Sequence, residues 1–187
     1  MHNPIGVTGI FNGNVTTGCS YDPLSHSSQR EITDLVVPGS IGKYPLKMTR
    51  YYNSRHFLSG SMGPGWSYEY YWGLSAAGSK LTYPNGNVLD RRCQQPVGIS
   101  DWWQTGTDFR LADGGTVHFD TNGAITAIDD PYGQRTTIQP GNPMIVTEPG
   151  GRYLKFIYTS YPGQASLLTT VEAHGLGNAT VTDSVNY

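Results

Sequence analysis

The feature that most constrains this chain is a glycine-punctuated turn that recurs along its second half. Three segments each carry an acidic residue, a tight turn ending in glycine and an expected outgoing strand; they are residues 112–119, 130–138 and 148–156. Gly115, Gly133 and Gly151 follow one another at intervals of 18 residues (133 − 115 and 151 − 133). About 18 residues accommodate two strands and two turns. The pattern therefore predicts a meander of β-hairpins, units that bury a core only together.

A block of longer strands precedes the repeat. Leu46, Met48 and Tyr52 alternate with mostly polar residues, which predicts one strand. Apolar residues in period two over 66–74 predict a second, continuous strand. Residues 81–90 carry an Asn-Gly pair between two short apolar runs, which is typical of a hairpin.

These patterns divide the chain into three segments. We expect a loosely structured arm over residues 1–29, an entry block of aromatic-rich strands over 30–104 and hairpin repeats over 105–187. The 24 Gly, 12 Pro and 13 Tyr fit a chain that turns often and has strong strand preference. The fold class predicted is all-β, a curved antiparallel meander with essentially no helix.

The charge balance and the polarity of the chain exclude several functions. With 12 basic and 14 acidic residues and a net charge of −2, the chain lacks the basic surface of a nucleic-acid binder. No apolar run approaches the roughly 20 residues of a membrane span, so we expect no membrane insertion. No signal peptide is visible after Met1. The five histidines are scattered without metal-ligand spacing, and we expect neither a metal nor a cofactor.

The two cysteines, Cys19 and Cys93, lie far apart in the sequence. Two unpaired thiols are the slightly favoured interpretation. The alternative is a disulfide that ties the N-terminal segment to the sheet, which would indicate an oxidising compartment.

Acidic residues next to the turns are the main candidates for chemistry. Asp113, Asp130 and Glu148 precede glycine turns, as do Asp129 and the more distant Glu172. A pair of carboxylates could serve a glycosidase, with Asp130 or Glu148 as the catalytic group. However, Asp accepts hydrogen bonds from turn amides, and a turn device recurs in every unit whereas a catalytic group need not. We therefore favour a structural role for these acids and expect no enzyme.

Two adjacent tryptophans, Trp102 and Trp103, are the candidate ligand-binding residues. Planar aromatic rings stack on sugar faces, so the pair could contact a carbohydrate. Because adjacent strand residues point to opposite faces, the alternative is that one ring belongs to the core and the other is exposed. The core role is the favoured interpretation.

The entry block carries motifs that resemble a known family. Residues 33–39, 45–46, 50–55 and 63–66 resemble the N-terminal entry segment of RHS proteins, and the later units resemble YD repeats. The resemblance covers about residues 12–187. It implies a long β-sheet wound into a hollow shell, which encloses a C-terminal polypeptide in toxin-bearing members. Related proteins on cell surfaces serve in adhesion and carbohydrate contact. The chain departs from the family in having fewer repeats and no counterpart of its self-cleavage motif.

The functional expectation is a non-enzymatic scaffold, secreted or at the cell surface. Open strand edges must be paired or covered, so we expect a partner: another copy of the chain, paired edge to edge or by strand donation, or further RHS repeats. The result would be an oligomer or a filament. The alternatives are a carbohydrate-binding or adhesion module that uses Trp102 and Trp103, and a fragment of a toxin-encapsulating shell.

Overall fold

The protein is all-β in the part that the structure describes. The computed structural model describes residues 19–22, 27–55, 59–75, 80–90, 102–103, 107–163, 165–177 and 180–187. Within these residues every regular element is a strand, every strand pair is antiparallel, and the all-β prediction is confirmed. No described segment forms a helix long and apolar enough to cross a membrane.

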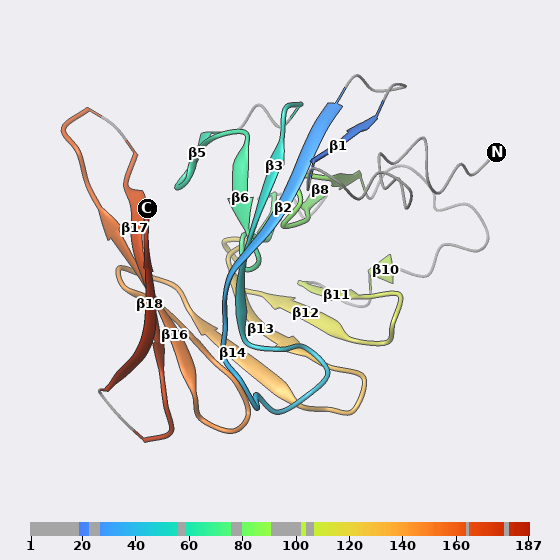
Figure 1. The fold of residues 1–187 in the computed structure, drawn as a ribbon. Coiled ribbons are helices and arrows are strands. Elements are labelled where there is room, and N and C mark those ends of the chain that lie inside the picture. The colour runs from blue at the N-terminus through green and yellow to red at the C-terminus, as the bar shows by residue number, and fades with distance from the viewer. Residues whose placement is uncertain are drawn as a thin grey trace.

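The entry block, which in the structure comprises the strands between residues 19 and 90, forms one layer (Figure 1). Its main sheet has the order β1-β2-β3-β6. These strands are β1 (Cys19–Asp22), β2 (Ser27–Val36), β3 (Lys47–Asn53) and β6 (Trp66–Tyr68). Two smaller sheets consist of β4 (Ser59–Gly60) with β5 (Gly63–Pro64), and of β7 (Gly73–Leu74), β8 (Lys80–Thr82) and β9 (Val88–Asp90). Strand structure therefore begins inside the segment for which we predicted a loose arm.

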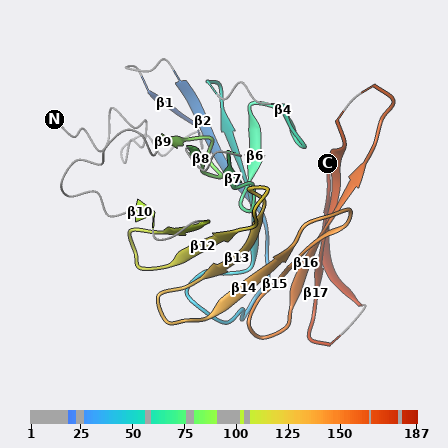
Figure 2. The ribbon, with the colours of Figure 1, turned by 180° about the vertical axis from the view of Figure 1, so that it is seen from behind.

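A nine-stranded sheet forms the other layer, and each strand pairs with the next one in the sequence. Its first strands are β10 (Trp102–Trp103), β11 (Asp108–Arg110), β12 (Thr116–Phe119), β13 (Ile125–Asp129) and β14 (Arg135–Gln139). It continues with β15 (Met144–Thr147), β16 (Tyr153–Thr159), β17 (Leu167–His174) and β18 (Val181–Asn186). The strand direction turns steadily from β12 to β17 (Figure 2), so this is the curved meander that the repeat predicted.

Five hairpin turns share one hydrogen-bond pattern. The amide of the first residue donates to the carbonyl of the fifth, and the amide of the fourth, a glycine, donates to the carbonyl of the first. The five turns are residues 83–87, 111–115, 120–124, 130–134 and 148–152. Their fourth residues have φ between 81° and 93°, a region that side chains other than glycine rarely adopt. Each is thus a three-residue hairpin loop closed by a glycine bulge.

The first interval of the repeat is one residue longer than predicted. The equivalent turn glycines are Gly114, Gly133 and Gly151, which lie 19 (133 − 114) and 18 (151 − 133) residues apart. Gly115, on which the predicted spacing rested, follows its turn and is buried. Gly114 and Gly115 are adjacent, and the sequence alone does not show which of them has the positive φ of the turn glycine.

The continuous strand predicted over residues 66–74 is wrong. β6 ends at Tyr68, where the amide of Tyr71 donates to the Tyr68 carbonyl across a turn. β7 then pairs with β8, and the Leu74 amide donates to the carbonyl of Gly123 in the meander. The backbone thus leaves one sheet for another while its aromatic side chains keep the apolar period that suggested a single strand.

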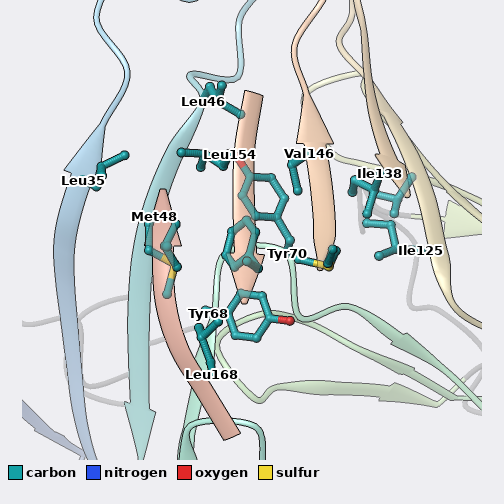
Figure 3. Packing of buried hydrophobic residues seen from close by; sticks show 14 of the residues in the cluster. Leu35, Leu46, Met48, Tyr68, Tyr70, Ile125, Ile138, Val146, Leu154 and Leu168 are labelled. Carbon is teal, nitrogen blue, oxygen red and sulfur yellow. The ribbon is translucent and has the colours of Figure 1, made fainter. Parts of the chain in front are cut away.

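The core lies between the two layers (Figure 3). Leu46 and Met48 of the entry block and Val146 and Leu154 of the meander are at most 1% exposed. Phe156 is fully buried at the centre. The Tyr68 ring stacks on it at 5.5 Å and the Tyr70 ring meets it edge-on at 5.8 Å. Since each buried side chain of this size stabilises the fold by about 1.5–3 kcal/mol, the layers stabilise one another.

Candidate functional site

The loop between β2 and β3 connects the entry block to three turns of the meander. We call residues 38–45 the anchor loop; it passes beside β14 in Figure 1, in blue to cyan. The Ile41 amide donates to Glu148 Oε2 at 2.6 Å, and the Lys43 amide donates to Asp130 Oδ2 at 2.8 Å. The Tyr44 hydroxyl donates to Asp113 at 2.7 Å, and Lys43 Nζ lies 2.8 Å from the same carboxylate. The loop therefore crosses successive turns in the reverse of their chain order.

The same carboxylates hold their own turns. Asp130 Oδ1 accepts the amides of Tyr132 and Gln134 at 2.8 and 2.9 Å. Asp113 accepts the Gly115 amide at 3.1 Å, and Glu148 accepts the Arg152 amide at 3.3 Å. Each of these turn acids, Asp113, Asp130 and Glu148, thus joins a turn of the meander to the anchor loop.

The hydrogen bonds favour the ionised form of two turn acids. Partial burial alone would raise the pKa of Asp113, but hydrogen bonds from Lys43 and Tyr44 outweigh it and lower that pKa. For Asp130, burial likewise opposes ionisation, and the three backbone amides it accepts lower its pKa. The carboxylates act as fixed acceptors for backbone donors.

Glycines make room for this close approach. A Cβ on Gly115 would collide with the Tyr44 hydroxyl and would lie 2.8 Å from the Asp129 carbonyl. A Cβ on Gly150 would lie 2.9 Å from Ile41 Cδ1. The second glycine therefore has a different role in each of the two Gly-Gly pairs. Gly151 forms the turn, whereas Gly115 lies under the anchor loop.

A second contact between the layers lies at the end of β18. Arg50 of β3 forms two hydrogen bonds with Asp34 of β2, at 2.5 and 2.9 Å. The Arg50 guanidinium lies 5.2 Å from the centres of the Trp66 and Tyr187 rings. The Tyr187 hydroxyl donates to Asp34 at 2.8 Å, and burial and this carboxylate raise the pKa of Tyr187. Sequence reasoning missed this cluster, because its members come from four separate segments.

A groove of about 420 Å³ opens beside this cluster. Its volume lies within the range of small-molecule sites, about 300–1,000 Å³. Trp66, Tyr161 and Tyr187 contribute aromatic rings, and Arg50 and Thr169 contribute polar side chains. Tyr161 is 46% exposed and lies in the loop between β16 and β17. The groove therefore combines aromatic rings with hydrogen-bonding groups.

Charged side chains pair across the strands on the outer face of the meander. His118 of β12 lies 2.9 Å from Asp108 and 3.0 Å from Asp129, and Arg135 pairs with Asp129 at 2.6 Å. The hydrogen bonds from Arg135 lower the pKa of Asp129. We predicted that Glu172 precedes a turn, but it lies within β17. It pairs there with Lys155 of β16 at 2.9 Å.

The predicted aromatic and cysteine sites are only partly described. The register of β10 places Trp102 opposite Arg110 and Trp103 opposite the buried Phe109. Both tryptophan side chains lie outside the description, so their roles stay predictions. The Cys19 side chain and Cys93 also lie outside the described residues, so their pairing stays a prediction.

A comparison with protein families gives one match. Residues 14–90 match a family model described as "Domain of unknown function (DUF6531)". The match covers less than half of the chain and includes β1 to β9, so the entry block is similar to this family and the meander from β10 onward lies outside the match. No curated protein matches the chain.

The contact beneath the anchor loop gives a first prediction. Gly115→Ala should lower the free energy of unfolding by about 1–3 kcal/mol, because the added methyl group must displace Tyr44 from Asp113. Gly175→Ala is the control, since a Cβ there meets only Thr182 Cγ2 at an ordinary 3.7 Å. Urea denaturation of both variants measures the difference. Equal stabilities for the two variants would contradict the tight approach.

The lowered pKa of Asp113 gives a second prediction. A carboxyl whose pKa is lower in the folded chain stabilises the fold above its ordinary value of 3.8, and this contribution is lost as the pH falls through the folded pKa. Wild type should therefore exceed Asp113→Asn in unfolding free energy above about pH 5, and the gap should shrink below pH 3.8. Urea titrations at several pH values test this. A gap independent of pH would show that the charge of Asp113 is not involved.

Proposed function

We propose that this chain is a non-enzymatic β-sheet scaffold of RHS/YD type, secreted or displayed at the cell surface. The entry block caps one face of the meander, and β18 accepts a further strand. The resemblance of the entry motifs to RHS proteins supports the family assignment, and the match of residues 14–90 to an uncharacterised domain coincides with the same block.

The observation that carries this proposal is the anchor loop. Its hydrogen bonds reach turns that lie 69, 87 and 107 residues away in the sequence. Each turn is attached at a fixed point of one short loop, so the loop sets how the hairpins are spaced and inclined at that edge. Polar groups that fix the curvature of a sheet favour a structural role for the protein.

The turn carboxylates support a structural role over a catalytic one. Asp130 and Glu148, the candidates for glycan cleavage, are 5% and 2% exposed. Their oxygens accept backbone amides from two directions. For Asp130, the hydrogen bonds from backbone amides lower the pKa, which makes this carboxylate a poor general acid.

The other half of the proposal rests on β18. This strand ends the nine-stranded sheet, and all its residues except Val185 are exposed. An edge strand of this kind offers unpaired backbone groups to another strand. Its partner would come from further repeats of a longer chain, as in a toxin-encapsulating shell, or from a second copy that builds an oligomer or filament.

Assembly through β18 gives a third prediction. Light scattering and negative-stain microscopy should show particles that grow with protein concentration. Ser184→Pro should abolish this growth, because proline removes an edge amide, while Ser184→Ala keeps the amide and should assemble like wild type. Circular dichroism checks that both variants fold. Growth that survives in Ser184→Pro would contradict pairing at this edge.

Carbohydrate binding is a second candidate function, and the aromatic groove at Arg50 favours it. Aromatic rings can stack on sugar rings while Arg50 and Thr169, which line the same groove, bond sugar hydroxyls. Contacts from Trp102 and Trp103 stay part of this candidate function.

The groove gives a fourth prediction. Tyr161→Ala should weaken binding of a glycan identified by array screening by about fivefold to tenfold, because it removes one aromatic face. Tyr132→Ala is the control, since Tyr132 is 81% exposed and does not line the groove. Calorimetric titration measures both affinities. Binding that is unchanged in Tyr161→Ala would contradict this site.

A further inference from the structure

We propose that the free edge of β18 selects a strand that carries a lysine or arginine opposite Asp183, in preference to a second β18. This inference rests on the proposed function, in which β18 accepts a further strand, and it adds the chemistry of the partner. It is supported by the charge pattern of the meander, the direction of the β18 amides and the position of Asp183.

The meander pairs its strand acids with bases from neighbouring strands. The described strands β11 to β18 contain four acidic residues, and three of them have such a partner. The pairs are Asp108 with His118, Asp129 with His118 and Arg135, and Glu172 with Lys155. Cross-strand pairs of opposite charge stabilise a sheet, and like charges placed opposite each other destabilise it.

Asp183 is the fourth acid, and no base of the described residues forms an ion pair with it. It lies in β18 opposite Ala173 of β17, so β17 offers it no charged partner. The three paired acids lie on the outer face of the meander, whereas Asp183 shares the opposite row of β18 with Val185. The strand on the other side of β18 is therefore the neighbour in the sheet that could place a base opposite Asp183.

The amide of Ser184 points to this free edge. The Tyr187 amide donates to the Thr169 carbonyl, so this pair is hydrogen-bonded. Hydrogen-bonded and non-hydrogen-bonded pairs alternate along an antiparallel ladder. Ser184, which is three residues from Tyr187 and opposite Glu172, therefore belongs to a non-hydrogen-bonded pair and directs its amide away from β17.

The Asp183 carboxylate already accepts the Ser184 amide, which a partner strand would need for its own hydrogen bond. Its Oδ1 accepts the Ser184 amide at 2.8 Å. An incoming strand must replace this contact with one of its own carbonyls, which leaves the Asp183 carboxylate without its donor. A lysine or arginine opposite Asp183 restores a partner for the carboxylate, whereas an acid adds repulsion. A second β18 supplies no base, because Asp183 is the one charged residue in Val181–Asn186.

The row that contains Asp183 also predicts a second residue of the partner. Val185 lies two residues further on the same side of β18 and packs against the core cluster. In an antiparallel partner, an apolar residue two positions before the base would lie opposite Val185. β2 approaches β18, and the Tyr187–Asp34 hydrogen bond lies just beyond the end of β18. The partner strand would accordingly pair with the part of β18 around Asp183.

A peptide titration of the full chain tests the inference. Three heptapeptides of alternating Thr and Val would differ only at the central residue, which is Lys, Thr or Glu. Nuclear magnetic resonance would follow the shift and hydrogen exchange of the Ser184 amide. On wild type, the Lys peptide should bind roughly fivefold more tightly than the Glu peptide, with Thr between them. Salt should reduce the difference, because the pair is exposed.

Variants make the test specific to Asp183. Asp183→Lys should reverse the order of the three peptide affinities, so that the Glu peptide binds most tightly. Asp183→Asn should make the three affinities equal. Glu31→Lys makes the same charge change at an exposed residue of β2 and should leave the order unchanged. Circular dichroism checks that each variant folds.

Three outcomes would overturn the inference, and they are distinguishable. Equal binding of the three peptides would show that β18 accepts strands without charge selection, and the proposed function would stand. Protection of Ser184 by wild-type self-association at concentrations below those at which the Lys peptide binds would make a second copy the preferred partner. Failure of every peptide and of self-association to protect Ser184 would refute β18 as an acceptor edge, and the proposed function with it.

Discussion

The hydrogen bonds between backbone amides of the anchor loop and buried turn carboxylates are the constraint on which the rest of this structure depends. Hydrogen bonds to an ionised acceptor are stronger than those between neutral groups. Here they join segments as far as 107 residues apart, so forming them has an entropic cost that local contacts do not offset. The apolar packing of Leu46, Met48, Leu154 and Phe156 offsets that cost, and the polar contacts then select one arrangement of the two layers.

The two contacts between the layers lie at opposite ends of the meander strands. The anchor loop meets the turn that precedes β16, whereas the Arg50 cluster meets Tyr187 beside Thr169, near the end of β16. Fixing both ends of the strands limits how far the sheet can twist relative to the entry block. The groove and Tyr187, which follows β18, both belong to this second contact, so they lie at the end of the meander strands opposite the anchor loop.

The sequence predicted the strands and turns better than it predicted the contacts between them. Alternating apolar residues and glycine turns are local signals, and they gave the all-β meander and the acids at Asp113, Asp130 and Glu148. The turn after Tyr68 could not be predicted, because the apolar period continues through it while the backbone changes sheets. The anchor loop has a weaker signal: Pro38, Gly39 and Gly42 mark an irregular segment, but nothing local shows that its amides and side chains reach carboxylates on three turns. Long-range pairing of polar groups depends on how the layers pack, and a single sequence does not contain that information in readable form.

Some carboxylates of this fold accept backbone amides that lack a strand partner. In the anchor loop, the amides of Ile41 and Lys43 have no ladder to join, and turn carboxylates accept them. At the edge of the meander, the Ser184 amide has no next strand, and Asp183 accepts it. The two cases differ in exposure: Glu148 is buried, whereas Asp183 is exposed. The same chemistry therefore satisfies backbone amides both where the entry block covers the meander and at the strand edge that no described strand covers.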